Sequence, residues 1–319
     1  MPNSFCINKL FNKLIFIGEI CQIRNNPWNK ERVEQWLADS GGALSVIEQS
    51  SVEKIVGILS EVNINFIEAY FLTKENERLW SILEQEIGTA HTEVIKGTLE
   101  NFSQRFDIFW QKEETRLTRI SKFLNSQSEK IETALVQVES LTGLESKIKL
   151  TNIPIQLAMS SAEKDDIVGW YSTLEEKTDL VLECSGVIEN NFPFLEAVLL
   201  HELFHFALRS RSVVMSLITN IADKNQDNLS PLSQDMSPLQ VLEELLVSSF
   251  TPEGYLATKY FNTTIDTAEK TDESVPHNFT LIRRRSAHAM KNLAKEYIDE
   301  KKCIDTRYLD SLIETIKNG

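Results

Sequence analysis

Residues 194–212, FLEAVLLHELFHFALRSRS, place His201, Glu202 and His205 in a stretch that is otherwise largely apolar. Such a stretch predicts a helix that is buried on most of its sides. Burying two imidazoles and a carboxylate is costly unless other groups pair with them. The stretch therefore predicts a buried helix whose polar side chains share a partner.

The spacing of the two histidines fits a metal site. Residues at i and i+4 share one face of a helix, so His201 and His205 can present imidazole nitrogens to the same ion. Glu202 follows the first histidine and lies close enough to act as a general base on a metal-bound water. Zinc lowers the pKa of such a water to about 7. We therefore expect Zn²⁺ as the cofactor, His201 and His205 as ligands and Glu202 as the catalytic base.

Two other interpretations of these residues are possible. In the first, they are ordinary core or surface residues that form the pattern by chance; in a chain with five histidines, the probability of a chance H-E-x-x-H is on the order of one in a hundred. Glu202-x-x-His205 is also half of the paired E-x-x-H pattern of di-iron carboxylate bundles. The sequence contains no second E-x-x-H, which argues against such a bundle.

The segments before the histidine stretch predict a small sheet. Ile153, Ile155, Leu157 and Met159 alternate as in a strand whose other face is more polar, and IVGWYS (167–172) and TDLVLECS (178–185) predict two further strands. Earlier in the chain the period is helical, with apolar positions at Leu79, Ile82, Leu83, Ile87, Ile131, Leu135 and Val138. We expect an α+β fold, mostly helical, with a small sheet preceding the H-E-x-x-H helix.

Composition narrows the function classes. The formal charge of −14 argues against a nucleic-acid partner, because a phosphate backbone requires a basic face. No apolar run is long enough to span a bilayer, and charged residues interrupt the N-terminal apolar stretch, so we expect no membrane partner and no signal peptide. The four cysteines form no C-x-x-C pair, which is typical of reduced thiols in a cytoplasmic protein.

Residues from about 148 to 260 resemble a gluzincin, the thermolysin-like branch of the zinc metallopeptidases. In that family a small sheet precedes the H-E-x-x-H helix, and a glutamate on a following helix is the third zinc ligand. The resemblance implies His201 and His205 as ligands and Glu202 as base. It does not extend into residues 1–97, so we expect a helical N-terminal region of unknown role at 1–97 and a zincin-like metallopeptidase domain at 98–319.

The third ligand is expected on the helix that begins at Ser237-Pro238, a typical cap followed by a typical first residue. The family order of apolar residue, polar residue and ligand fits Leu242-Glu243-Glu244, which favours Glu244. Glu243 is the second choice and Glu253, in a turn, the third.

The sequence departs from the gluzincin pattern at two positions. The family places an aspartate four residues after the third ligand, where it orients a zinc-bound histidine; this chain has Ser248 there, whose hydroxyl could still accept a ring N–H. The usual small residue after the ligand is replaced by Leu245.

Candidates for a transition-state hydrogen-bond donor are Tyr255, Tyr260, His277 and His288, and the sequence does not rank them. Arg283, Arg284 and Arg285 predict a solvated helix face or, as the second interpretation, a site for a substrate carboxylate.

The sequence thus predicts a zinc-dependent peptidase that hydrolyses peptide bonds through a metal-bound water activated by Glu202. Its substrate would be a peptide or protein, bound in extended form by β-addition to a strand of the small sheet. The alternative is a catalytically silent helical scaffold or binding protein with a structural zinc site. The oligomeric state stays open.

Overall fold

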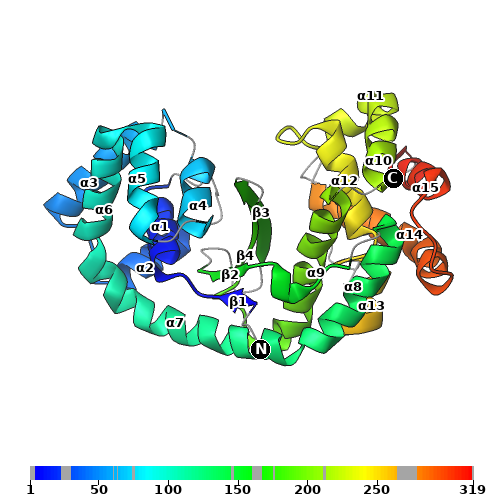
Figure 1. Cartoon of the computed structure of the whole chain (residues 1–319), viewed down its shortest axis with the longest axis horizontal. Coiled ribbons are helices and arrows are strands. Elements are labelled where there is room, and N and C mark those ends of the chain that lie inside the picture. The colour runs from blue at the N-terminus through cyan, green and yellow to red at the C-terminus, as the bar shows by residue number, and fades with distance from the viewer. Residues whose placement is uncertain are drawn as a thin grey trace. The chain divides into compact units, whose positions relative to one another are not determined.

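The computed structural model of the chain describes residues 4–22, 30–59, 61–62, 64–73, 76–144, 147–159, 167–174, 177–210, 213–263 and 279–317. The chain divides into two compact units. Unit 1 comprises Met1–Ser126 and Thr151–Glu189, and unit 2 comprises Gln127–Leu150 and Asn190–Gly319. The described residues are mostly helical and include one small mixed sheet, which confirms the expected α+β class (Figure 1).

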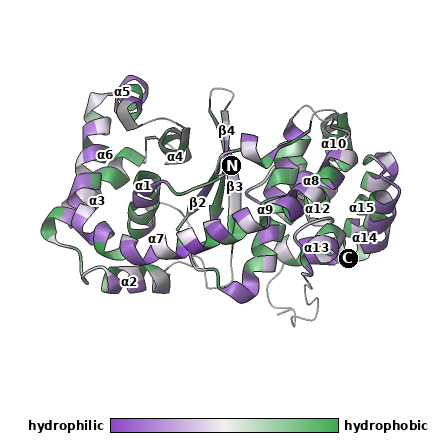
Figure 2. Cartoon of the chain, turned by 60° about the horizontal axis from the view of Figure 1, so that its bottom comes forward, coloured by the Kyte–Doolittle hydropathy of each residue, from purple (hydrophilic) through white to green (hydrophobic). Residues whose placement is uncertain are grey.

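Unit 1 contains seven of the described α-helices and the sheet. The helices are α1 (Lys9–Ile20), α2 (Lys30–Asp39), α3 (Val46–Leu59), α4 (Ile64–Thr73), α5 (Asn76–Ile87), α6 (Thr89–Asn101) and α7 (Ser103–Ser126). Purple and green segments alternate along α7 in Figure 2, as expected of an amphipathic helix with one face in a core. The domain boundary that we expect between residues 97 and 98 stays a prediction; in the structure the two are consecutive residues of α6.

The turn between α2 and α3 is held by a buried ion pair. Gly41 and Gly42 follow α2 with φ angles of +117° and +82°, a backbone conformation that favours glycine. Arg105 of α7 donates from Nε to Glu48 Oε1 (2.7 Å) and from Nη1 to the Gly42 carbonyl (2.8 Å). The arginine thus satisfies backbone groups that the tight turn leaves unpaired.

The sheet has the strand order β1-β2-β4-β3, from β1 (Phe5–Cys6), β2 (Ile155–Ala158), β3 (Val168–Leu174) and β4 (Lys177–Glu183). β2 pairs in parallel with β1 and β4, and β3 pairs with β4 antiparallel. The three strands expected from the sequence are confirmed. All four residues of β2 are buried, so the face expected to be more polar, which carries Gln156, is covered as well. The cause is a cover of helices: α1 and α7 both pack on β2, and Asn12 of α1 bonds to the Leu157 carbonyl and the Met159 N–H.

The regular secondary structure of the described residues of unit 2 is helical. The helices are α8 (Ser128–Thr142), α9 (Phe192–Arg209), α10 (Val213–Lys224), α11 (Gln226–Leu229), α12 (Pro238–Ser248), α13 (Tyr255–Phe261), α14 (Phe279–Asp299) and α15 (Thr306–Lys317). A short 3₁₀ turn lies at Ser230–Leu232 in this unit, and two others, Leu150–Asn152 and Glu189–Asn191, include residues of both units. The predicted histidine helix is α9, and it packs against α8, α10, α12 and α13, so it forms the centre of this unit.

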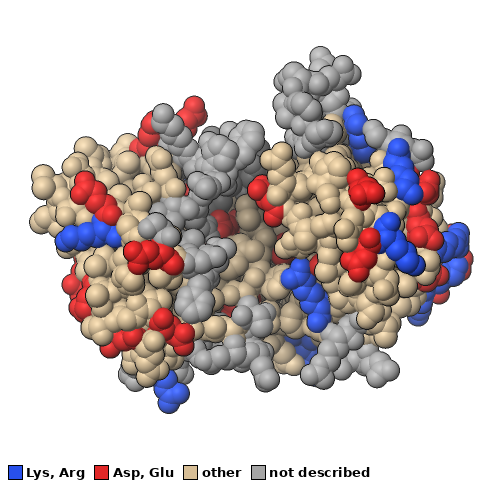
Figure 3. All heavy atoms as spheres, turned by 90° about the horizontal axis from the view of Figure 1, so that it is seen from above, with Lys and Arg blue, Asp and Glu red and all other residues tan. Residues whose placement is uncertain are grey.

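None of the helices in the ranges given above combines the length and the hydropathy that a bilayer crossing requires. On the face in view in Figure 3, basic and acidic side chains are interspersed.

Candidate metal centre

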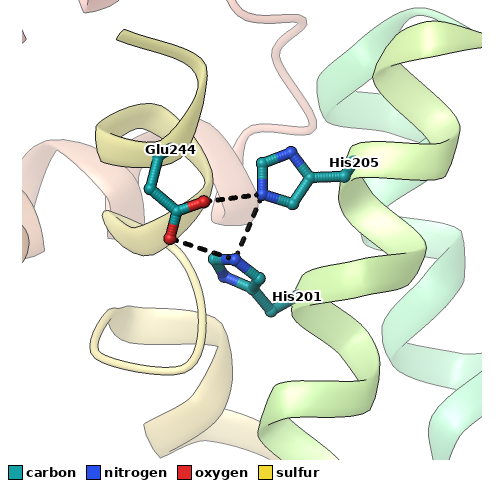
Figure 4. A group of neighbouring side chains, drawn as sticks. All are labelled: His201, His205 and Glu244. Carbon is teal, nitrogen blue, oxygen red and sulfur yellow. Dashed lines mark hydrogen bonds and ion pairs between the residues drawn. The ribbon is translucent and has the colours of Figure 1, made fainter. Parts of the chain in front are cut away.

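Three side chains from two helices converge in unit 2. His201 and His205 come from α9 and Glu244 from α12 (Figure 4). The His201 and His205 Nε2 atoms are 3.1 Å apart. Glu244 Oε1 lies 3.3 Å from His201 Nε2, and Glu244 Oε2 lies 3.1 Å from His205 Nε2. The side chains are 7%, 9% and 19% exposed in the same order, so the group is close to the surface but almost enclosed.

Local sequence explains why both helices present these side chains. The histidines are one turn apart, so their rings lie one above the other on the face of α9 that meets α12. Helix α12 begins with a capping box: Ser237 Oγ accepts from the Gln240 N–H, and the Gln240 side chain accepts from the Ser237 N–H. Pro238 occupies the first turn, as expected from the sequence. The cap thus fixes where α12 begins, and the packing of α12 against α9 brings Glu244 to the histidines.

Hydrogen bonds on the far side of each ring determine which nitrogen is free. His201 Nδ1 lies 2.7 Å from the Thr251 carbonyl oxygen, and His205 Nδ1 lies 2.7 Å from Glu243 Oε1. A carbonyl and a carboxylate only accept, so both Nδ1 atoms carry the proton and donate it. In the neutral form that a metal ligand requires, the Nε2 lone pairs point toward each other and toward Glu244.

This arrangement fits a metal ion. Two lone pairs and a carboxylate at close range repel one another unless a cation lies among them. Ligand atoms placed tetrahedrally at about 2.0–2.1 Å from zinc are separated by about 3.3 Å. The two Nε2 atoms are 3.1 Å apart, and each lies 3.1–3.3 Å from a different oxygen of Glu244. One ligand atom from each residue lies within 4.8 Å of the other two. His201, His205 and Glu244 could therefore hold a metal ion.

The pKa shifts show that the group favours positive charge. Burial by itself lowers the pKa of His205, but the hydrogen bond to Glu243 and the Glu244 carboxylate outweigh it and raise the pKa to about 10. Burial by itself raises the pKa of Glu244, but the two histidines outweigh it and hold this pKa well below its usual value. Protons and metal ions compete for such ligands, so the negative charge that binds a proton in the free protein also attracts a cation.

Glu243 lies behind His205 rather than among the three converging side chains. Its Oε1 accepts from His205 Nδ1, and both of its oxygens accept from Arg209, at 2.9 Å from Nε and 2.9 Å from Nη2. A carboxylate on the outer nitrogen of a ligating histidine fixes the tautomer and orientation of the ring. Of the two adjacent glutamates, the structure thus brings Glu244 to the histidine Nε2 atoms and Glu243 to the outer side of one ring.

Glu202 lies on α9 between the two histidines and is 7% exposed. Burial raises the pKa of its carboxyl, and the nearby histidines oppose this rise. Glu202 is adjacent to His201 in the chain and is not one of the three converging residues.

The arginine cluster on α14 does not form a purely solvated face. Arg283 is 25% exposed and donates from Nη1 to Glu244 Oε1 at 2.8 Å. Its Nε and Nη2 donate to Glu253 Oε1 at 2.9 Å and 2.6 Å. The first interpretation is therefore wrong for Arg283, because folding pairs it with two carboxylates. Glu253, the third choice for a ligand, is the anchor of this arginine.

Ser248 does not orient a histidine in the way that the family aspartate would. Its Oγ is buried and has no hydrogen-bond partner among the described residues. Both ring N–H groups are already taken, by Thr251 and Glu243. In this chain the carboxylate that orients a histidine is Glu243, one residue before Glu244, and the histidine that it orients is His205.

The transition-state donors suggested by the sequence stay unranked. Tyr255 and Tyr260 are partly exposed on α13, and His288 is exposed on α14. His277 lies outside the described residues.

Comparisons of the chain with protein-family models, with curated proteins and with solved structures found no match. The support for a metal site comes from the side chains and distances given above.

Proposed function

We propose that the protein is a zinc-dependent peptidase in which His201, His205 and Glu244 hold the zinc ion and Glu202 is the general base. The observation that supports this most is the convergence of both histidine Nε2 atoms on Glu244 while their Nδ1 atoms are held from behind. The hydrogen bonds at Nδ1 thus fix the orientation in which each ring presents its Nε2 atom to a metal ion.

The donor set favours zinc and favours catalysis over a structural role. Two imidazole nitrogens and a carboxylate oxygen are typical donors for zinc. Structural zinc sites use four protein ligands, whereas catalytic sites use three and leave the fourth position for water or substrate. The group contains three such residues among those described.

The proposed chemistry divides between the ion and Glu202. Bound zinc would supply a Lewis acid that polarises the substrate carbonyl and lowers the pKa of water. Glu202 would accept a proton from the attacking water and later return it to the leaving amine. Because Glu202 is buried on a helix between two oriented residues, its carboxylate has few positions available, which suits a base that acts at one place.

The test is the substitution Glu202→Gln. Glutamine keeps the size of the side chain and removes the base, so zinc content should stay at the wild-type value while hydrolysis falls by roughly two or more orders of magnitude. Zinc content and turnover are measured on the same preparations, with a peptide that the wild type cuts from a mixed pool. Glu132→Gln is the matched control, because Glu132 is exposed on α8 of the same unit.

Three results separate the candidate functions. Loss of turnover with retained zinc in Glu202→Gln, and normal turnover in the control, supports the peptidase. Wild-type protein that binds zinc and cuts nothing in a broad pool supports the scaffold with a structural zinc site. Equal cutting by Glu202→Gln and wild type contradicts the assignment of the base.

A further inference from the structure

The two oxygens of Glu244 have different surroundings. Oε1 accepts a hydrogen bond from Arg283 Nη1 at 2.8 Å and lies 3.3 Å from His201 Nε2. Oε2 lies closer to a histidine, 3.1 Å from His205 Nε2. A guanidinium N–H on a carboxylate forms one of the stronger hydrogen bonds in proteins, so it withdraws charge mainly from the oxygen that accepts it.

Arg283 cannot easily follow Glu244 if that carboxylate rotates. Two of its nitrogens, Nε and Nη2, are bonded to Glu253 Oε1, and the Glu253 side chain is only 3% exposed. Glu253 directly precedes Gly254, where the backbone passes so near Ser249 that a Cβ atom would lie 2.0 Å from its carbonyl oxygen. The guanidinium is planar and its donors have fixed directions. The donor that faces Glu244 therefore has a fixed position.

We infer that Arg283 is a positioning residue. Its hydrogen bond occupies Glu244 Oε1, so that Glu244 binds the metal through Oε2 alone. This inference rests on the proposed metal site. A carboxylate that binds with both oxygens would occupy one more position around the ion. By preventing this, Arg283 keeps positions free for water and for a substrate carbonyl, which a hydrolase requires.

A substrate-carboxylate site at Arg283 has less support. Its Nε, Nη1 and Nη2 atoms already donate to two carboxylates, those of Glu244 and Glu253. A third carboxylate would meet one unit of net negative charge, since a single guanidinium lies between two glutamates. The geometry therefore favours a role for Arg283 in positioning Glu244 over a role in binding a substrate carboxylate.

The experiment compares metal coordination in the full-length wild type, Arg283→Met and Arg209→Met. Methionine keeps much of the side-chain volume and removes the charge and the donors. Arg209 is the matched control, because it forms the same kind of pair with Glu243, the neighbour that faces the outer side of His205. Each protein is loaded with Co²⁺ and its visible absorption is recorded, and zinc-loaded samples are measured by X-ray absorption to count the ligand atoms.

The expected result is a four-coordinate ion in the wild type and in Arg209→Met, and a five-coordinate ion in Arg283→Met. Wild-type coordination in Arg283→Met, or the same change in both variants, overturns the inference. Infrared carboxylate bands of the wild type, compared with and without Zn²⁺, give a second measurement that does not depend on folding of the variant. A bidentate carboxylate there overturns the role of Arg283 and leaves the metal site intact, whereas wild-type protein that binds neither ion overturns both.

Discussion

His205 Nδ1 and Glu243 Oε1 are 2.7 Å apart, in a buried hydrogen bond that joins the H-E-x-x-H helix to the carboxylate immediately before Glu244. Two consecutive glutamates on α12 thus meet opposite sides of one imidazole: Glu243 reaches the outer nitrogen and Glu244 the inner one. Adjacent helical residues point about 100° apart, so one helix turn can supply both a ligand and the group that orients a ligand. The contacts of these two residues lead to different predictions for their removal.

Replacing Glu244 by alanine is expected to weaken zinc binding more than replacing Glu243. Glu244→Ala leaves two imidazoles as protein ligands, whereas Glu243→Ala leaves all three ligands and removes the partner of His205 Nδ1. Loss of a hydrogen-bond partner of a ligating histidine typically lowers metal affinity by about 10- to 100-fold, which is the effect expected of Glu243→Ala. Affinities are measured by competition with a chromophoric chelator, with Glu132→Ala as the exposed control. The reverse order would assign the ligand to Glu243.

Gly254→Ala is expected to damage both stability and the metal site. A Cβ atom at Gly254 would lie 2.0 Å from the Ser249 carbonyl oxygen and 2.3 Å from its carbon, so the backbone between the two residues must move. Thr251 lies in that segment: its carbonyl orients His201, and its hydroxyl donates to the Ala197 carbonyl on α9. We expect a loss of about 1–3 kcal/mol in the free energy of unfolding together with weaker zinc binding.

Gly97→Ala is the control for this glycine. It lies in α6 with open space around the added Cβ, so alanine there should stabilise the protein by roughly 0.5–1 kcal/mol and leave zinc affinity unchanged. Urea unfolding and chelator competition measure the two effects. Equal behaviour of the two variants would contradict the role of the 249–254 segment.

The buried pair between Glu48 and Arg105 predicts a pH dependence of stability in unit 1. The hydrogen bond from Arg105 lowers the pKa of Glu48 from 4.5 to about 2. Because the folded-state pKa is depressed, this stabilisation is fully present above about pH 4.5 and is lost as the pH falls from there toward 2. Arg105→Met should cost about 3–5 kcal/mol at pH 7, because it leaves a buried carboxylate without its partner. The difference from wild type should shrink as the pH falls through this window.

Urea unfolding at pH 7, 5 and 3 measures this dependence. The exposed pair between Lys9 and Asp107, with side chains 56% and 57% exposed, is the control. Lys9→Met should change the free energy of unfolding by no more than about 0.5 kcal/mol at any of these pH values. A difference between Arg105→Met and wild type that is the same at pH 7 and pH 3 would contradict the lowered pKa of Glu48.

Much of the fold near the site follows from local signals in the sequence. Apolar residues around His201 and His205 predict α9, and Ser237-Pro238 predicts the start of α12. Gly143 ends α8 in a left-handed conformation, which is a common role of glycine at the end of a helix. Strand β1 was not predicted, because a two-residue strand has no periodicity and its partner Ile155 lies far along the chain.

The residues that support the histidines and Glu244 are less accessible to sequence reasoning. Thr251 contributes a backbone carbonyl, which any residue type possesses, so its role has no compositional signal. Arg283 reaches Glu244 across 39 residues and is one of three adjacent arginines that a linear pattern cannot tell apart. Glu243 and Glu244 are adjacent carboxylates on one predicted helix, so the sequence leaves Glu243 as the second choice for the ligand. The side of the ring that each one reaches depends on the rotation of α12 against α9, which only the packed structure specifies.

The most direct test of the metal centre is the zinc content of purified protein after loading with zinc and exhaustive dialysis, measured by mass spectrometry for wild type and for His201→Ala/His205→Ala. We expect about one zinc per wild-type chain, since one group of three converging ligands is present among the described residues, and none in the double variant. Circular dichroism of both proteins verifies that the variant is folded. Stoichiometric zinc in a folded double variant, or no zinc in the wild type, would contradict the site.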